Sequence, residues 1–208
     1  MKRKRSGSGA GRPFFNLREM ERGVRIFHQG LGPVVSPRDL RKTPKLVARA
    51  FSEELLSGYK MGIPARLQPL SEAPPDALVV VRGIRFVAVC RHHLLPFQGI
   101  ASVAYLPHRR LAGFSSVARL VDTLARRLQI QEDLSEQILD CLEESLGPRG
   151  SACLLQATHQ CMTCRGARQI HSGVATLQVR GVFHENIARR REVVSLLKSP
   201  PEAAGVAS

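Results

Sequence analysis

Residues 77–106 read ALVVVRGIRFVAVCRHHLLPFQGIASVAYL, and this stretch decides the fold. Residues 77–90 alternate in polarity and are rich in Val, Ile and Phe, which predicts a strand that is broken at Gly83. A His-His-Leu-Leu-Pro turn separates it from a second strand, predicted over residues 99–106. The pattern therefore indicates a hairpin whose connecting turn carries two imidazoles next to a thiol.

Helices and strands are predicted in groups on both sides of this hairpin. Helices are predicted at residues 17–29, from Pro44 to Leu56, from an N-cap at Ser115 or Ser116 to Leu128, at 134–146 and at 185–198, and strands at 151–159 and 174–183. Elements that are grouped in this way indicate an α+β fold with an antiparallel sheet. The expected divisions are a disordered basic tail (1–12), an N-terminal helical region (13–76), the sheet-containing domain (77–198) and a flexible tail (199–208).

The composition limits the classes of protein to consider. The 208 residues are 43% hydrophobic, enough for one domain with a core. No apolar run is long enough to cross a bilayer and none follows the basic start, so we expect no membrane partner and no export. Five cysteines, an odd number, favour free thiols in the cytoplasm. Lys and Arg outnumber Asp and Glu by 14, which favours anionic partners such as nucleotides, nucleic acid or phosphorylated substrates.

Two distant motifs carry candidate metal ligands. Cys90-Arg91-His92-His93 and Thr158-His159-Gln160-Cys161-Met162 together offer two thiols and three imidazoles, donors that suit zinc. Cys90 and His93 have a chelating C-x-x-H spacing, and Cys161 would add a third ligand. Three protein ligands leave a fourth position for water, as in catalytic zinc sites, and His92 would be free to act on a substrate. The alternative is that these are ordinary core cysteines and turn histidines.

The other cysteines are weaker candidates. Cys161 and Cys164 form a C-x-x-C, which is typical of a redox pair or of half a zinc knuckle. No strand-turn-helix context supports a thioredoxin-type site, so Cys164 is expected to be a bystander. Cys141 and Cys153 fall on apolar positions of a predicted helix and strand, and both are expected to pack in the core.

Gln131-Glu132 is either a solvated helix end or a recognition element. A carboxylate in a pocket would accept two parallel hydrogen bonds from the ring N–H and the exocyclic amine of guanine, a donor pair that adenine lacks. Arg119 and Arg165 are candidate phosphate-binding cations, and the alternative for each is an ordinary surface position.

Several motifs, taken in order along the chain, resemble those of the GTP cyclohydrolase I family. They are Cys90–Phe97, Ala104–Pro107, Gly113–Arg119, Arg126–Glu132, Thr158–Met162 and Gly181–Phe183. The resemblance covers about residues 38–198 and is most specific in residues 86–166. It implies the tunnelling fold, an antiparallel sheet with helices on one face, assembled into a toroidal homo-oligomer, commonly a decamer, with active sites between subunits.

The resemblance also implies a role for individual residues. The matches are Cys90, His93 and Cys161 as zinc ligands, His92 and His159 as catalytic histidines, Gln131 and Glu132 as the purine-recognising pair, and Ser115 (also counted as catalytic), Arg119 and Arg165 near the ribose and triphosphate. The implied reaction adds activated water to C8 of GTP, opens the imidazole ring and releases formate. The ribose then opens, rearranges and recloses to give 7,8-dihydroneopterin triphosphate.

Four positions depart from the family pattern, one of them Arg49, where the family usually has Lys. Arg91 stands where the family usually has Glu, Ser116 where it has Lys, and Leu46 where it has Arg. Two triphosphate-side cations are therefore missing, and Arg91 is expected to restore one as a substrate-binding residue. The leading interpretation is a zinc-dependent GTP cyclohydrolase I of folate and pterin biosynthesis. The alternatives are a same-fold zinc enzyme for another phosphorylation state of a guanine nucleotide, or a non-catalytic basic binding module; we do not expect nucleic acid as a partner.

Overall fold

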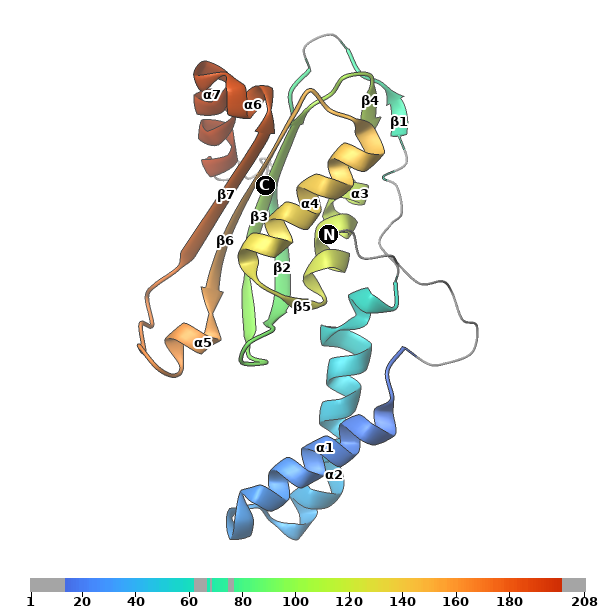
Figure 1. Cartoon of the computed structure of the whole chain (residues 1–208), viewed down its shortest axis with the longest axis vertical. Helices are drawn as coiled ribbons and strands as arrows, with labels where there is room; N and C mark the ends of the chain where they lie inside the picture. The colour runs from blue at the N-terminus through green and yellow to red at the C-terminus, as the bar shows by residue number, and fades with distance from the viewer. Residues whose placement is uncertain (1–13, 62–66, 68, 75–76, 200–208) are drawn as a thin grey trace, which may run out of the picture. The chain divides into compact units, whose positions relative to one another are not determined.

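The computed structural model describes residues 14–61, 67, 69–74 and 77–199, which form parts of two compact units, Met1–Glu54 and Leu55–Ser208 (Figure 1). The predicted tail at residues 1–12 lies outside the described residues, as does nearly all of the predicted C-terminal tail. Within the described ranges, no helix combines the length and the apolar character needed to cross a membrane.

The N-terminal unit contains helices α1 (Leu17–Gly30) and α2 (Pro37–Arg49), joined through the short 3-10 helix η1 (Gly32–Val34). The helix predicted over residues 17–29 is confirmed, whereas the start predicted at Pro44 is wrong. Ser36 caps α2 because its hydroxyl accepts the Asp39 N–H, and the next residue is a proline at the first helical position. A π-helical segment, η2 (Ala50–Leu55), continues from the end of α2.

Pro44 therefore lies inside α2, where it lacks the N–H that would otherwise bond the Leu40 carbonyl. The Arg25 guanidinium of α1 donates to that carbonyl, with Nη1 and O 3.2 Å apart. A bond between the two helices thus replaces the bond that proline removes within one of them.

A five-stranded sheet forms the centre of the C-terminal unit, in the order β5-β2-β3-β6-β7 (Figure 1). Its strands are β2 (Val79–Cys90), β3 (Pro96–Leu106), β5 (Leu128–Gln129), β6 (Gly150–His159) and β7 (Val174–Gly181). All neighbouring strands are antiparallel except the short β2–β5 pair. Strands β1 (Pro69–Glu72) and β4 (Arg110–Ala112) form a separate pair, and a 3-10 turn, η3 (Ser57–Tyr59), precedes them.

The hairpin and the α+β class with an antiparallel sheet are confirmed. The break predicted at Gly83 is also present, since this glycine has φ +73° and the β2–β3 register shifts between Val81 and Ile84. A positive φ is available to glycine without steric cost, so the irregularity occurs where the sequence allows it.

Helices α3 (Phe114–Ala125) and α4 (Gln131–Leu146) cover one face of this sheet (Figure 1). The main core between them and the sheet is largely apolar, with Phe97, Val103, Leu124, Ile138 and Leu155 all fully buried. A smaller cluster forms where the last helices, α6 (Val182–Glu185) and α7 (Ile187–Lys198), bury Phe183, Val193 and Leu197 against alternate residues of β3 and β6. Because neighbouring residues of a strand face opposite sides, this second cluster lies on the other face of the sheet.

Two more predicted helix starts are wrong. Gly113, and neither Ser115 nor Ser116, is the N-cap of α3, so both serines lie in its first turn. Helix α4 begins at Gln131 and not at residue 134, which places Gln131 and Glu132 in its first turn. Glu132 and Asp133 in this first turn interact favourably with the positive end of the helix dipole, although no side chain caps the helix.

Candidate active site

The β3–β6 pairing brings the two separated motifs to one end of the sheet. Phe97, just after the His-His turn, is the cross-strand partner of His159. Strand β2 ends at Cys90, and the single-turn helix α5 (Gln160–Thr163), which carries Cys161, follows β6 directly. The antiparallel register therefore accounts for the meeting of residues that are far apart in sequence.

Cys90, His93 and Cys161 form a group whose ligand atoms all lie within 4.8 Å of one another. Cys90 Sγ and His93 Nδ1 are 3.9 Å apart, close to the separation of about 3.6 Å expected between sulfur and nitrogen ligands of tetrahedral zinc. Burial, and then the neighbouring Cys90 thiol, raises the pKa of Cys161. A cation between the two sulfurs would favour their thiolates instead, so the donor set fits zinc.

The turn between β2 and β3 is held mainly by its own backbone. The Leu94 N–H donates to the Cys90 carbonyl and the Cys90 N–H to the Leu95 carbonyl, each at 2.9 Å. Leu94 has φ +55°, an unfavourable conformation for a leucine. His92 and His93 are both exposed and their ring planes lie 85° apart, so adjacent imidazoles face different directions.

His159 occupies the packed side of the site. Its ring stacks on Phe97, with centroids 4.4 Å apart and planes 6° from parallel. Its Nε2 lies 2.8 Å from Gln131 Oε1. Burial lowers the pKa of His159, and the charge of Glu132 opposes that shift. The surroundings therefore favour a neutral, oriented imidazole.

Gln131 determines which nitrogen of His159 carries the proton. It is 1% exposed, and its amide nitrogen lies 3.0–3.2 Å from the carbonyls of Leu155 and Val174 and the hydroxyl of Thr176. The amide oxygen must then face His159 and accept a hydrogen from Nε2, which leaves Nδ1 of the neutral ring able to take up a proton. The structure thus places Gln131 beside a candidate catalytic histidine, and its purine contact stays a prediction.

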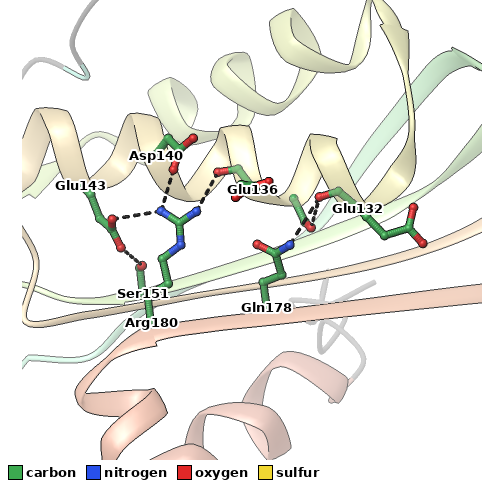
Figure 2. Close-up of polar contacts among 8 residues, drawn as sticks. Glu132, Glu136, Asp140, Glu143, Ser151, Gln178 and Arg180 are labelled. Atoms are coloured by element: carbon green, nitrogen blue, oxygen red, sulfur yellow. Dashed lines mark hydrogen bonds and ion pairs between the residues drawn. The ribbon is translucent and has the colours of Figure 1, made fainter. Parts of the chain in front are cut away.

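Glu132, the next residue, is exposed. Its backbone carbonyl accepts hydrogen bonds from Ser135 Oγ (2.7 Å) and from Gln178 Nε2 (3.5 Å). Figure 2 shows its carboxylate directed away from Gln178. The main chain of this residue is therefore held while its carboxylate remains accessible to a ligand.

Arg180 fastens the edge strand β7 to α4 further along the helix (Figure 2). Its Nη1 lies 2.7 Å from Asp140 and 3.0 Å from Glu143, and Glu143 also accepts from the Ser151 hydroxyl. These contacts join α4 to β6 and β7, the strands whose carbonyls hold Gln131.

The remaining candidates lie on separate elements. Ser115 and Arg119 are exposed on α3, and Arg119 Nη2 donates to Ser116 Oγ at 3.2 Å. Arg165 is exposed just after α5, close enough to Cys161 for its charge to lower the pKa of that thiol, against the larger effects that raise it. Their roles toward the ribose and phosphates stay predictions.

Sequence reasoning missed two contacts of this site. Arg91 Nη2 lies 2.7 Å from Asp133 Oδ2, an ion pair that only the folded arrangement of β2 and α4 reveals. The stacking of Phe97 on His159 was also missed, although the position of Phe97 one residue beyond the turn could have indicated it once the strand register was known.

A family profile described as GTP cyclohydrolase I matches residues 20–198. The chain belongs to the GTP cyclohydrolase I family. GTP cyclohydrolase 1 of Pelotomaculum thermopropionicum is 38% identical over 185 residues, which cover 88% of this chain and 98% of the relative. The GTP cyclohydrolase 1 proteins of Campylobacter jejuni subsp. jejuni serotype O:6 and Bacillus cytotoxicus are 39% and 36% identical. Each alignment covers 88% of this chain, and the two cover 96% and 97% of the respective relatives.

Membership of the GTP cyclohydrolase I family confirms the resemblance drawn from the motifs. Among solved structures, the archaeosine synthase QueF-Like in the apo form aligns with a TM-score of 0.44 and 18% identity, over 52% of this chain and 97% of that chain.

Proposed function

We propose that this chain is a zinc-dependent enzyme that converts GTP and water to 7,8-dihydroneopterin triphosphate and formate. The observation that carries the proposal is the meeting, at one end of the sheet, of the Cys90–His93–Cys161 group with the oriented imidazole of His159. Membership of the GTP cyclohydrolase I family supports GTP as the substrate.

The chain's own residues are suited to move protons at this site. Cys90, His93 and Cys161 would hold zinc, which supplies Lewis acidity and lowers the pKa of water. His159 is suited to accept a proton at Nδ1, because Gln131 occupies its other nitrogen. His92 is exposed beside a metal ligand and supplies a second imidazole for proton transfer.

Glu132 is the proposed reader of the guanine base. An accessible carboxylate in the first turn of α4 can accept the ring N–H and exocyclic amine of guanine together. Arg119 and Arg165 would bind phosphate oxygens, and Ser115 would contact the ribose. We expect Glu132→Gln to weaken GTP binding by about 1–3 kcal/mol, measured as the dissociation constant, with Glu136→Gln one turn later as the matched control. A Glu132→Gln variant that binds GTP as the wild type does would refute this role.

The proposal extends to assembly and cellular setting. We propose a toroidal homo-oligomer, up to a decamer, with active sites between subunits, acting in the first step of folate and pterin biosynthesis. All five cysteines are free in the structure. Because a thiolate site requires reduced cysteines, we propose the cytoplasm as its location.

A substrate with fewer phosphates is the second candidate. Leu46 and Ser116 replace two cations usual in the family, and Arg91 is already paired with Asp133. The test is incubation of the zinc-loaded protein with GTP, GDP, GMP and guanosine, followed by measurement of formate and of the fluorescent oxidised pterin. Preference for GTP supports the main proposal, and preference for a substrate with fewer phosphates supports the second. No formate from any of them would refute both.

A further inference from the structure

An ion pair joins the two chemically distinct parts of the candidate site. Arg91 Nη2 and Asp133 Oδ2 are 2.7 Å apart. Arg91 directly follows the metal-ligand candidate Cys90, and Asp133 directly follows the proposed base reader Glu132. One side-chain contact therefore connects the immediate neighbours of the two groups that must act on the same substrate.

Backbone contacts run beside this pair. The Arg91 N–H donates to the Gln129 carbonyl at 3.1 Å, and Cys90 pairs with Gln129 in the parallel β2–β5 ladder. Strand β5 then leads through Ile130 directly into α4. The main chain brings the two segments together, and the ion pair adds a side-chain contact between the first turn of α4 and the residue that follows β2.

We propose that Arg91 and Asp133 form a strut, the Arg91–Asp133 strut, that positions Glu132 relative to the metal ligands. The inference rests on the proposed function and assigns Arg91 a different task from the phosphate contact expected from sequence. The carboxylate of Asp133 neutralises the guanidinium, and it would also repel a phosphate brought to the same place.

The exposure of the pair indicates which property it affects. The side chains of Arg91 and Asp133 are 41% and 40% exposed, and exposed pairs contribute little to the free energy of unfolding. Reaction rate depends more steeply on position, because a misplacement of about 1 Å can cost about 100-fold. Loss of the strut should therefore impair turnover without unfolding the protein.

A charge swap tests the strut. We expect Arg91→Asp and Asp133→Arg each to lower kcat/KM for GTP on the order of 10-fold. The double variant Arg91→Asp/Asp133→Arg should recover to within about threefold of wild type, since it restores an ion pair in the reverse sense. Arg91→Lys should retain most activity, and Arg85→Asp, the same reversal at an exposed position of β2, is the matched control.

The affinity for guanosine separates the strut from phosphate binding. If the pair acts as a strut, Arg91→Asp should weaken the binding of GTP and the binding of guanosine by the same factor. A loss confined to GTP, or a double variant no better than the single ones, would overturn the inference.

A measurement without turnover separates this inference from the proposed function. Amide hydrogen exchange at Arg91 and at Leu134, whose N–H makes the first backbone bond of α4 to the Ile130 carbonyl, reports how the two segments are held. We expect faster exchange in both single variants and recovery in the double variant. Wild-type protein that releases no formate from GTP would refute the proposed function alone, whereas unchanged exchange in the single variants would refute the strut.

Discussion

The two turns that supply the candidate metal ligands are built in different ways. The turn after β2 exposes His92 and His93 and is held by backbone bonds around a left-handed Leu94. The turn after β6 instead seats His159 between the ring of Phe97 and the amide of Gln131. The imidazole on the β6 side is therefore held by side-chain contacts, whereas the two imidazoles of the other turn are exposed and binding of a metal would hold His93. The first three predictions below test that difference through turnover and metal retention.

The largest effect is expected where the two turns share the metal. Cys161→Ser should abolish zinc retention and formate release together, because one sulfur of a three-ligand site is lost. Zinc per chain is measured by elemental analysis. Cys164→Ser, in the same turn, should retain zinc and activity, since Cys164 is exposed and lies outside the ligand group. Full activity of Cys161→Ser would remove the metal assignment.

The second prediction concerns the β6 side of the site, where Gln131 holds His159. Gln131→Leu leaves His159 Nε2 and the Leu155 carbonyl without this partner, which should lower the free energy of unfolding by about 1–3 kcal/mol. We expect kcat to fall about 10–100-fold, the range found when hydrogen-bond partners that orient metal-ligating side chains are removed. The KM for GTP should change less than about threefold. Gln156→Leu, exposed on β6, is the control. A rise in KM at unchanged kcat would show instead that Gln131 reads the purine.

The third prediction removes the stacked ring. Phe97→Leu should cost about 1–2 kcal/mol of unfolding free energy and lower kcat less than Gln131→Leu does. Phe86→Leu provides the comparison, because Phe86 meets Phe97 edge-on at 6.1 Å in the same core. It should lose similar stability in chemical denaturation and keep its kcat. Equal losses of kcat in both variants would mean that stacking on His159 has no special importance.

The smallest effect is expected in the exposed turn. Leu94→Asn should raise the free energy of unfolding by about 0.5–1 kcal/mol, because asparagine tolerates a positive φ better than leucine. Leu94 is 53% exposed, so little packing is lost. Denaturant titration measures the change, with Leu95→Asn as a control at a partly buried neighbour. A destabilised Leu94→Asn would indicate that the leucine side chain makes packing contacts that this turn needs.

Much of the fold follows from local pattern. Strand alternation in β2 was sufficient, because Ile84, Phe86 and Ala88 are buried while Arg85 and Val87 between them are exposed. Helix α1 was also predicted, although none of its residues is buried. The sequence predicts that α2 starts at Pro44 because proline suits the first turn of a helix. In the structure Pro44 lies inside the helix, and the hydrogen bond that it cannot donate is replaced by one from Arg25 on another helix. Ser115 was a plausible cap by residue type, but Gly113 ends the preceding extended segment.

The candidate site could also be predicted only in part. Thiols and imidazoles show their chemistry in the sequence, so the structure brings together three ligands that could be named beforehand. The orientation of Gln131 depends on Leu155, Val174 and Thr176, which are 24 to 45 residues away. No local pattern encodes such contacts, nor the pairing of Arg91 with Asp133.

The carbonyl of Leu40, left open by Pro44 and filled by Arg25, makes residues 25 and 44 epistatic. With alanine at position 44, the helix would bond this carbonyl internally and Arg25 would become dispensable. With proline present, loss of Arg25 leaves the acceptor to water. The effect of replacing Arg25 therefore depends on whether residue 44 is proline, and it is expected to be small because this carbonyl lies at an exposed position.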